Sequence, residues 1–98
     1  MAATYIFKSS GQYLGFVISD YFFSRDGIYL GWVESPYVWD SSGQFRGELR
    51  EGAYILRNLY AIPPVPKVPK VAPPTPPLPP PPPNRVPIIL QIGYVDAF

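Results

Sequence analysis

The side chains of this sequence that could do acid–base chemistry are carboxylates, because paired carboxylates can serve as general acid and general base. Those in the first part of the chain all stand at predicted turns or strand ends, where they form turns and stay solvated: Asp20, Asp26, Glu34, Asp40, Glu48 and Glu51. The serine pairs Ser9-Ser10 and Ser41-Ser42 also lie at turns, and no histidine or obvious lysine is placed to activate them. We therefore assign no catalytic residue and expect the protein not to be an enzyme.

The composition excludes further kinds of site. The 98 residues include no cysteine and no histidine, and the formal net charge is +1. The chain therefore has no disulfide or thiolate nucleophile, and it lacks the commonest metal ligand and general base. A charge so close to zero gives no electrostatic basis for binding nucleic acid. We expect no metal, no cofactor and no nucleic-acid partner.

Glycine spacing gives the clearest pattern in the chain, an internal repeat of sixteen residues. Two glycine series share this period, Gly11, Gly27 and Gly43 in one and Gly15, Gly31 and Gly47 in the other. Each copy begins with an aromatic-rich tetrapeptide, such as Tyr5-Ile-Phe-Lys8. A fourth copy begins at Tyr54 and loses both glycines. The repeats are expected at about residues 5–20, 21–36, 37–52 and 53–62.

Each copy is predicted to form a β-hairpin, because tyrosine, valine, phenylalanine and tryptophan favour strands. The first glycine of each copy ends a three-residue turn, where only glycine adopts a left-handed conformation cheaply. The second glycine falls within a strand, which indicates a sharp bend or a close backbone approach. Four hairpins of about eight short strands, curved in this way, predict an all-β, shallow, pseudo-four-fold barrel.

Alternation along the second strand of each hairpin assigns its two faces. In the first copy Tyr13, Gly15 and Val17 are predicted to face the core, as are their counterparts in the next two copies. The opposite face carries four large apolar residues in the first two copies: Leu14, Phe16, Leu30 and Trp32. We expect the segment 86–95 either to cover this patch or to pair with an edge strand near the incomplete fourth copy.

The remainder of the chain has the opposite composition. Residues 1–62 form the repeat domain, and residues 63–87 contain fourteen of the fifteen prolines. This proline-rich stretch is predicted to be a polyproline II linker. Residues 88–98 return to an apolar composition and are predicted to form a C-terminal strand or arm that docks within the chain or onto another chain.

The motif Tyr-Φ-aromatic-x-x-x-Gly-x-Tyr/Phe-x-Gly, where Φ is apolar, resembles the four-fold β-flower family over roughly residues 4–62. The proline-rich extension strengthens the resemblance. It implies a shallow, pseudo-symmetric β-barrel and transfers no functional residue. The fourth copy departs from the motif by lacking its glycines, so its second strand can be supplied differently.

Two surfaces are candidates for binding. The first is aromatic and would suit a sugar, a lipid or a proline-rich ligand; the alternatives are packing between repeats and covering by the chain's own proline rod. It comprises Phe16, Trp32, Tyr37 and Trp39. The second is the candidate assembly arm, comprising Ile88, Ile89, Leu90, Ile92, Tyr94 and Phe98. Within the proline tract, residues 66–70 and 76–79 are similar to ligand cores of SH3 and WW domains, although a spacer or packing role also explains them.

The leading hypothesis is a structural, assembly or protein-interaction module whose partner is either a second copy, through arm exchange, or another protein. The alternative hypothesis is a binding domain for a lipid or other apolar small molecule in the barrel mouth. The sequence shows neither a signal peptide nor an apolar run long enough for a membrane span. We therefore expect a cytoplasmic location.

Overall fold

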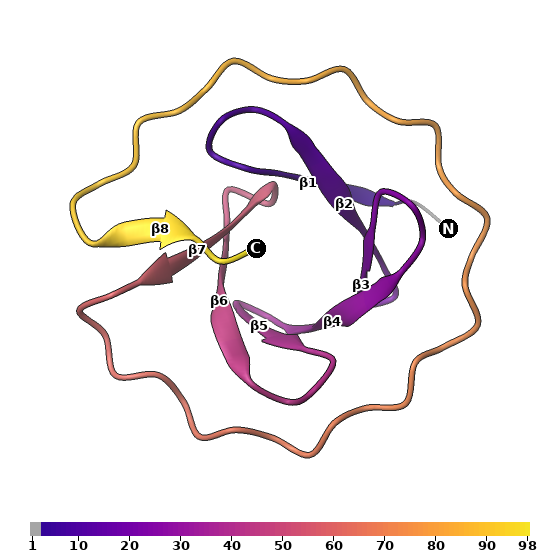
Figure 1. Ribbon diagram of the computed structural model, residues 1–98, viewed down its shortest axis with the longest axis horizontal. Coiled ribbons are helices and arrows are strands. Elements are labelled where there is room, and N and C mark those ends of the chain that lie inside the picture. The colour runs from indigo at the N-terminus through magenta and orange to yellow at the C-terminus, as the bar shows by residue number, and fades with distance from the viewer. Residues whose placement is uncertain (1–2) are drawn as a thin grey trace.

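A computed structural model describes residues 3–98, and it is built from β-strands with no helix among these residues (Figure 1). Its eight strands form one sheet in chain order. They are β1 (Thr4–Phe7), β2 (Tyr13–Ile18), β3 (Tyr21–Ser24), β4 (Tyr29–Glu34), β5 (Tyr37–Asp40), β6 (Phe45–Arg50), β7 (Tyr54–Asn58) and β8 (Tyr94–Asp96).

The first seven strands close into a barrel. Consecutive strands pair antiparallel, and β1 also pairs parallel with β7 at Phe7 and Tyr54. The backbone N–H of Phe7 donates a 2.7 Å hydrogen bond to the carbonyl of Ala53 at this seam. The all-β, closed, consecutive-hairpin architecture predicted from the sequence is therefore confirmed. Closure leaves no free edge between β1 and β7.

A β-bulge in each of the first three hairpins changes which residues face the interior. The pairing of β1 with β2 passes from Ile6 opposite Gly15 directly to Phe7 opposite Tyr13, so Leu14 is the extra residue. The same register shift occurs at Leu30 in the second hairpin and at Arg46 in the third. A bulge interrupts the alternation of faces, which a strict period of two along the sequence does not anticipate.

The predicted faces are consequently wrong before and at the bulged residue and right after it. Leu14 and Leu30, expected on the outer face, pack against the interior cluster, as does Val17. Tyr13, expected in the core beside Val17, belongs instead to a separate cluster with Phe7.

The mid-strand glycines lie where neighbouring hairpins approach most closely. A Cβ atom on Gly15 would lie 2.0 Å from the carbonyl oxygen of Phe23, and one on Gly31 would lie 1.9 Å from that of Trp39. For Gly47 the corresponding distance, to the carbonyl oxygen of Leu56, is 2.5 Å. No side chain fits in these gaps, so glycine at these positions permits the curvature that closes the barrel.

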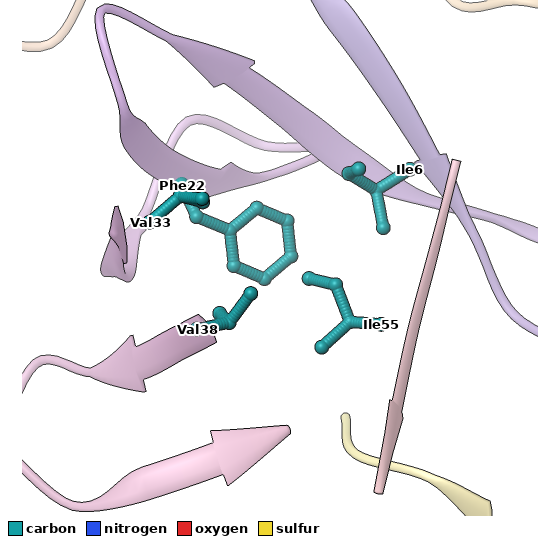
Figure 2. Close-up of a cluster of buried hydrophobic side chains, with 5 residues drawn as sticks. All are labelled: Ile6, Phe22, Val33, Val38 and Ile55. Carbon is teal, nitrogen blue, oxygen red and sulfur yellow. The ribbon is translucent and has the colours of Figure 1, made fainter. Parts of the chain in front are cut away.

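The interior is filled by aliphatic side chains that surround the phenyl ring of Phe22. Figure 2 shows the ring of Phe22 with Ile6, Val38 and Ile55 pointing towards it, and Val33 completes the buried cluster. Ile6, Phe22, Val38 and Ile55 each directly follow the first tyrosine of a repeat. The four-fold repetition in the sequence therefore becomes a four-fold arrangement in the core.

The fourth hairpin is complete, although its two strands are far apart in the sequence. Gly93 has a φ of 92°, close to the values of 87–90° at the turn glycines of the first three hairpins. Ala97 follows Gly93 by four residues, which is also the spacing between the two glycines of each repeat. Strand β8 pairs antiparallel with β7, and the N–H of Ala97 donates to the carbonyl of Ile55 at 3.1 Å. The proline-rich residues between these two strands are therefore the loop of the fourth hairpin.

We expect Gly15→Ala to reduce the free energy of unfolding by at least about 2 kcal/mol, because its Cβ would overlap the Phe23 carbonyl. Gly52→Asn is the matched control. Nothing lies within 4 Å of a Cβ at Gly52, whose φ is +67°, and asparagine tolerates that conformation at a cost below about 1 kcal/mol. Urea denaturation measures both variants, and similar losses in both would contradict the close-approach explanation.

Candidate functional site: a proline-rich belt around the barrel

The loop of the fourth hairpin, residues 59–93, runs around the outside of the barrel and is called the belt below. It leaves the end of β7, passes the other hairpins in turn and returns to β8 (Figure 1). A 2.7 Å hydrogen bond from the N–H of Leu59 to the carbonyl of Gly93 joins its two ends. The molecule is a disc of 37 × 35 × 17 Å, and the belt forms its rim.

Burial along the belt repeats every three residues. Between residues 63 and 88 the partly buried positions are Pro64, Pro73, Pro76, Pro79, Pro82 and Ile88, and the others are exposed. All six belong to one series with a spacing of three, and so do the only charged residues of the belt, Lys67, Lys70 and Arg85. Three residues per turn is the period of polyproline II. One face of the belt therefore points towards the barrel along its whole course.

The two lysines of this inward face lie on the two tryptophans of the chain. Lys67 Nζ is 4.9 Å from the centroid of the Trp39 ring, and Lys70 Nζ is 5.5 Å from that of Trp32. Both amines also meet Glu34: Lys67 is hydrogen-bonded to its carboxylate, and Lys70 lies 3.9 Å away. These five residues are called the Glu34 clasp below. They combine ion pairing with cation–π attraction at one point of the rim.

The clasp changes the ionisation of Glu34. The hydrogen bond from Lys67 lowers the pKa of this carboxyl below its ordinary value, with smaller contributions from Trp32 and from the charge of Lys70. The nearby Asp40 carboxyl also has a lowered pKa: burial alone would raise it, but hydrogen bonds from Ser42 and Gln44 outweigh that effect. Both groups are therefore carboxylates at neutral pH.

Backbone contacts fasten the belt to the hairpin turns. The N–H of Lys67 donates to the carbonyl of Gly43, and the N–H of Arg85 donates to that of Gly11, both at 2.8 Å. At these two turns, a Cβ atom on the glycine would lie within 2 Å of a belt carbonyl. The turn glycines therefore reverse the chain and also make room for the belt.

Further polar contacts hold the second half of the belt. Tyr5 donates its hydroxyl to the carbonyl of Pro80 at 3.0 Å, and Asn84 accepts the N–H of Tyr13 at 3.1 Å. Arg85 lies over the ring of Phe7, 4.3 Å from its centroid. Both halves of the belt are thus joined to the barrel.

The predicted aromatic surface is mostly buried. Phe16, Trp32 and Trp39 are inaccessible to solvent or nearly so, and Tyr37 is 40% exposed. Phe16 stacks on Phe23 at 5.4 Å, and Trp32 stacks on Trp39 at 6.5 Å. Two stacked pairs thus line the outer wall that the belt surrounds. Of the roles considered for this surface, its arrangement fits covering by the chain's own proline-rich segment.

The predicted arm docks on its own chain. Ile88, Leu90 and Tyr94 pack against the cluster that contains Phe7 and Tyr13. Phe98 reaches the interior, where its ring meets Phe22 edge-on at a centroid distance of 5.1 Å.

The remaining two residues of the predicted arm, Ile89 and Ile92, are exposed. Within the arm, the carboxylate of Asp96 accepts hydrogen bonds from the backbone N–H and the hydroxyl of Ser9, at 2.8 and 2.6 Å. This link between β8 and the first turn was not predicted from the sequence.

Other kinds of site find no support in residues 3–98. They contain no group of three or more acidic, histidine or cysteine side chains placed to hold a metal ion. None of the elements found there is a helix long and apolar enough to cross a membrane.

Comparison with known proteins gives one match. A family model described as 4-fold beta flower protein matches residues 2–91. This range covers the three contiguous hairpins, β7 and nearly the whole belt. No curated protein and no solved structure matches the chain.

Lowering the pH is expected to loosen the Glu34 clasp. Because the folded-state pKa of Glu34 is lowered, its stabilising effect is complete above the ordinary value of 4.5 and is lost as the pH falls through the lower folded-state value. Trp32 and Trp39 are the only two tryptophans, so their emission should shift to longer wavelength below pH 4.5 as water reaches the rings.

Glu34→Gln should show part of this shift already at pH 7 and respond less to acid. Glu48→Gln, which alters a glutamate paired with Arg50 instead of with the belt, is the control and should behave like the unmodified chain. An emission spectrum that is identical in all three proteins across the pH range would rule out the clasp as a determinant of belt docking.

Proposed function

The chain belongs to the 4-fold beta flower protein family, and from that premise we propose that it is a small, non-catalytic protein-interaction module. In this proposal the barrel is a scaffold, and the belt is the segment that another protein recognises. The observation that supports it is the three-residue periodicity of burial along residues 63–88. One face of the belt is held against the barrel, and most residues of the other two are exposed.

Holding the belt in place favours recognition thermodynamically. A free proline-rich segment loses conformational entropy when a partner binds it. Here the barrel has already ordered the backbone on folding, through the Glu34 clasp and the hydrogen bonds at Gly11 and Gly43. A partner that binds the belt therefore meets a preorganised ligand, which raises affinity by lowering the ordering cost.

The proposal gives the arm an in-chain role and names a different protein as the partner. Strand β8 is tethered to β7 by a long loop whose ends meet at Leu59 and Gly93. Tethering gives a strand a high effective concentration at its own barrel, and short, strained hinges are the ones that favour exchange between chains. A homo-oligomer formed by arm exchange is the competing arrangement.

No observation favours an apolar ligand inside the barrel. The centre is occupied by Phe22 and its aliphatic neighbours, and Phe98 packs against them. Two hollows of about 230 and 210 Å³ lie between the belt and the outer wall, one beside Tyr54 and Leu90 and one beside Tyr21 and Pro73. The alternative of a lipid or apolar small molecule in the barrel mouth is therefore not pursued.

Amide hydrogen exchange tests whether the belt is docked in solution. The N–H groups of Lys67 and Arg85 donate to barrel carbonyls, so we expect them to exchange at least about tenfold more slowly than in an unstructured peptide. Val68 and Val71 are the matched controls within the same belt, and their amides should exchange at the unstructured rate. Equal, unprotected exchange at all four positions would contradict the proposal.

Light scattering on the intact chain tests the in-chain role of the arm. We expect the mass of a monomer, 11.0 kDa, independent of protein concentration, because β8 already pairs with β7 of its own chain. A stable dimer that becomes monomeric when Tyr94 and Phe98 are both replaced by alanine would instead support arm exchange.

A further inference from the structure

The belt carries a continuous apolar ridge on the side that faces away from the barrel. Each ridge residue directly follows a position of the inward series, and every one is exposed. None is charged or polar. The ridge consists of Ile62, Val65, Val68, Val71, Pro74, Pro77, Pro80, Pro83, Val86, Ile89 and Ile92.

One part of the ridge has the form of a polyproline II ligand. Val65-Pro66 and Val68-Pro69 are two aliphatic-proline pairs, and all four residues are exposed, with exposed fractions of 81% for Val65 and 86% for Val68. Lys67, the residue between the pairs, turns inward to Trp39 and Glu34. Aromatic grooves that read polyproline II take up residues spaced three apart on one side of such a helix. The clasp thus presents both pairs outward.

The second proline-rich stretch that resembles a ligand, residues 76–79, is used by the barrel. Pro76 and Pro79 belong to the partly buried inward face. The side chain of Leu78 lies over Gly27, and the carbonyl of the adjoining Pro80 accepts the Tyr5 hydroxyl. This stretch has fewer free groups for a partner than residues 65–69.

Resting on the proposed function, we infer that residues 65–69 are the docking segment and that the partner is a domain with an aromatic groove that reads polyproline II. The ridge is one residue wide and runs along the convex rim of a disc. A second copy would touch such a rim over only a few residues, far less than the roughly 800 Å² per partner of a stable interface. A narrow concave groove fits this shape.

Two other occupants conflict with the chemistry of the segment. Pro66 and Pro69 have no N–H, so a partner strand cannot form a regular ladder of hydrogen bonds with it. An anionic surface would need free positive charge, but Lys67 and Lys70 already engage Glu34, and the ridge itself is uncharged. Apolar side chains and unpaired proline carbonyls remain, and these are the groups that aromatic grooves with hydroxyl or indole donors bind.

The experiment uses a panel of SH3 domains as probes. A synthetic peptide of residues 62–73 first identifies the domain that binds it best, and that domain is then titrated into the isotope-labelled intact chain. We expect the largest chemical-shift changes at the amides of Lys67 and Val68. Val68→Ser should weaken binding about tenfold or more, whereas Val86→Ser should change it less than about twofold. Val86 is the matched control because it is an exposed ridge valine with one proline after it and no second pair.

Three results would overturn the inference. They are a panel in which no domain binds the peptide, an intact chain that the peptide-binding domain does not bind, and equal effects of Val68→Ser and Val86→Ser. Amide exchange at Lys67 and Arg85, measured on the same sample, separates this failure from that of the proposed function. Protected amides without binding leave the docked belt in place and reject only residues 65–69 as the docking segment.

Discussion

The structure depends on covering the aromatic outer wall of a very small barrel. Strand alternation gives the barrel two apolar surfaces, an interior around Phe22 and an outer wall that includes Phe16 and Trp32, both almost fully buried. A domain of about sixty residues is marginally stable, and exposing the second of these surfaces to water would destabilise it further. The chain buries it with its own belt and arm, so the proline-rich segment is part of the folded unit.

A polyproline II chain suits this covering role because of its backbone. The belt is rich in prolines, which have no N–H, so burying one face leaves few donors to satisfy. The amides of Lys67 and Arg85 are two that remain on that face, and both bond to a turn carbonyl. Proline also restricts the unfolded chain, which lowers the entropy lost when the belt is ordered. A β-strand in the same place would need a continuous partner ladder.

Sequence reasoning predicted the repeat, the hairpins and the role of the glycines because each leaves a local signal. It misassigned the faces of Leu14, Leu30 and Tyr13 because one bulged residue reverses the alternation. No residue type in the sequence indicates where such a bulge occurs. It offered pairing of residues 86–95 with an edge strand near the fourth copy as one of two possibilities, and β8 does pair with β7. It did not identify Gly93 as the turn glycine of that copy, because the loop from Leu59 to Gly93 is far longer than the three-residue turns of the other hairpins. The three-residue series of Lys67, Lys70 and Arg85 is present in the sequence, but charged residues ordinarily face the solvent, so this series did not identify the inward face of the belt.

The same contacts that fasten the belt determine which of its side chains face the solvent. A polyproline II helix has three faces, so fixing one of them fixes the orientation of the other two. Lys67 and Lys70 are three residues apart and share Glu34, which locks this orientation where Val65 and Val68 lie. With this phase of the belt, the lysines meet the tryptophans and Glu34, and the valines that follow them are exposed. Stability of the barrel and display of the ridge are therefore two consequences of one spacing.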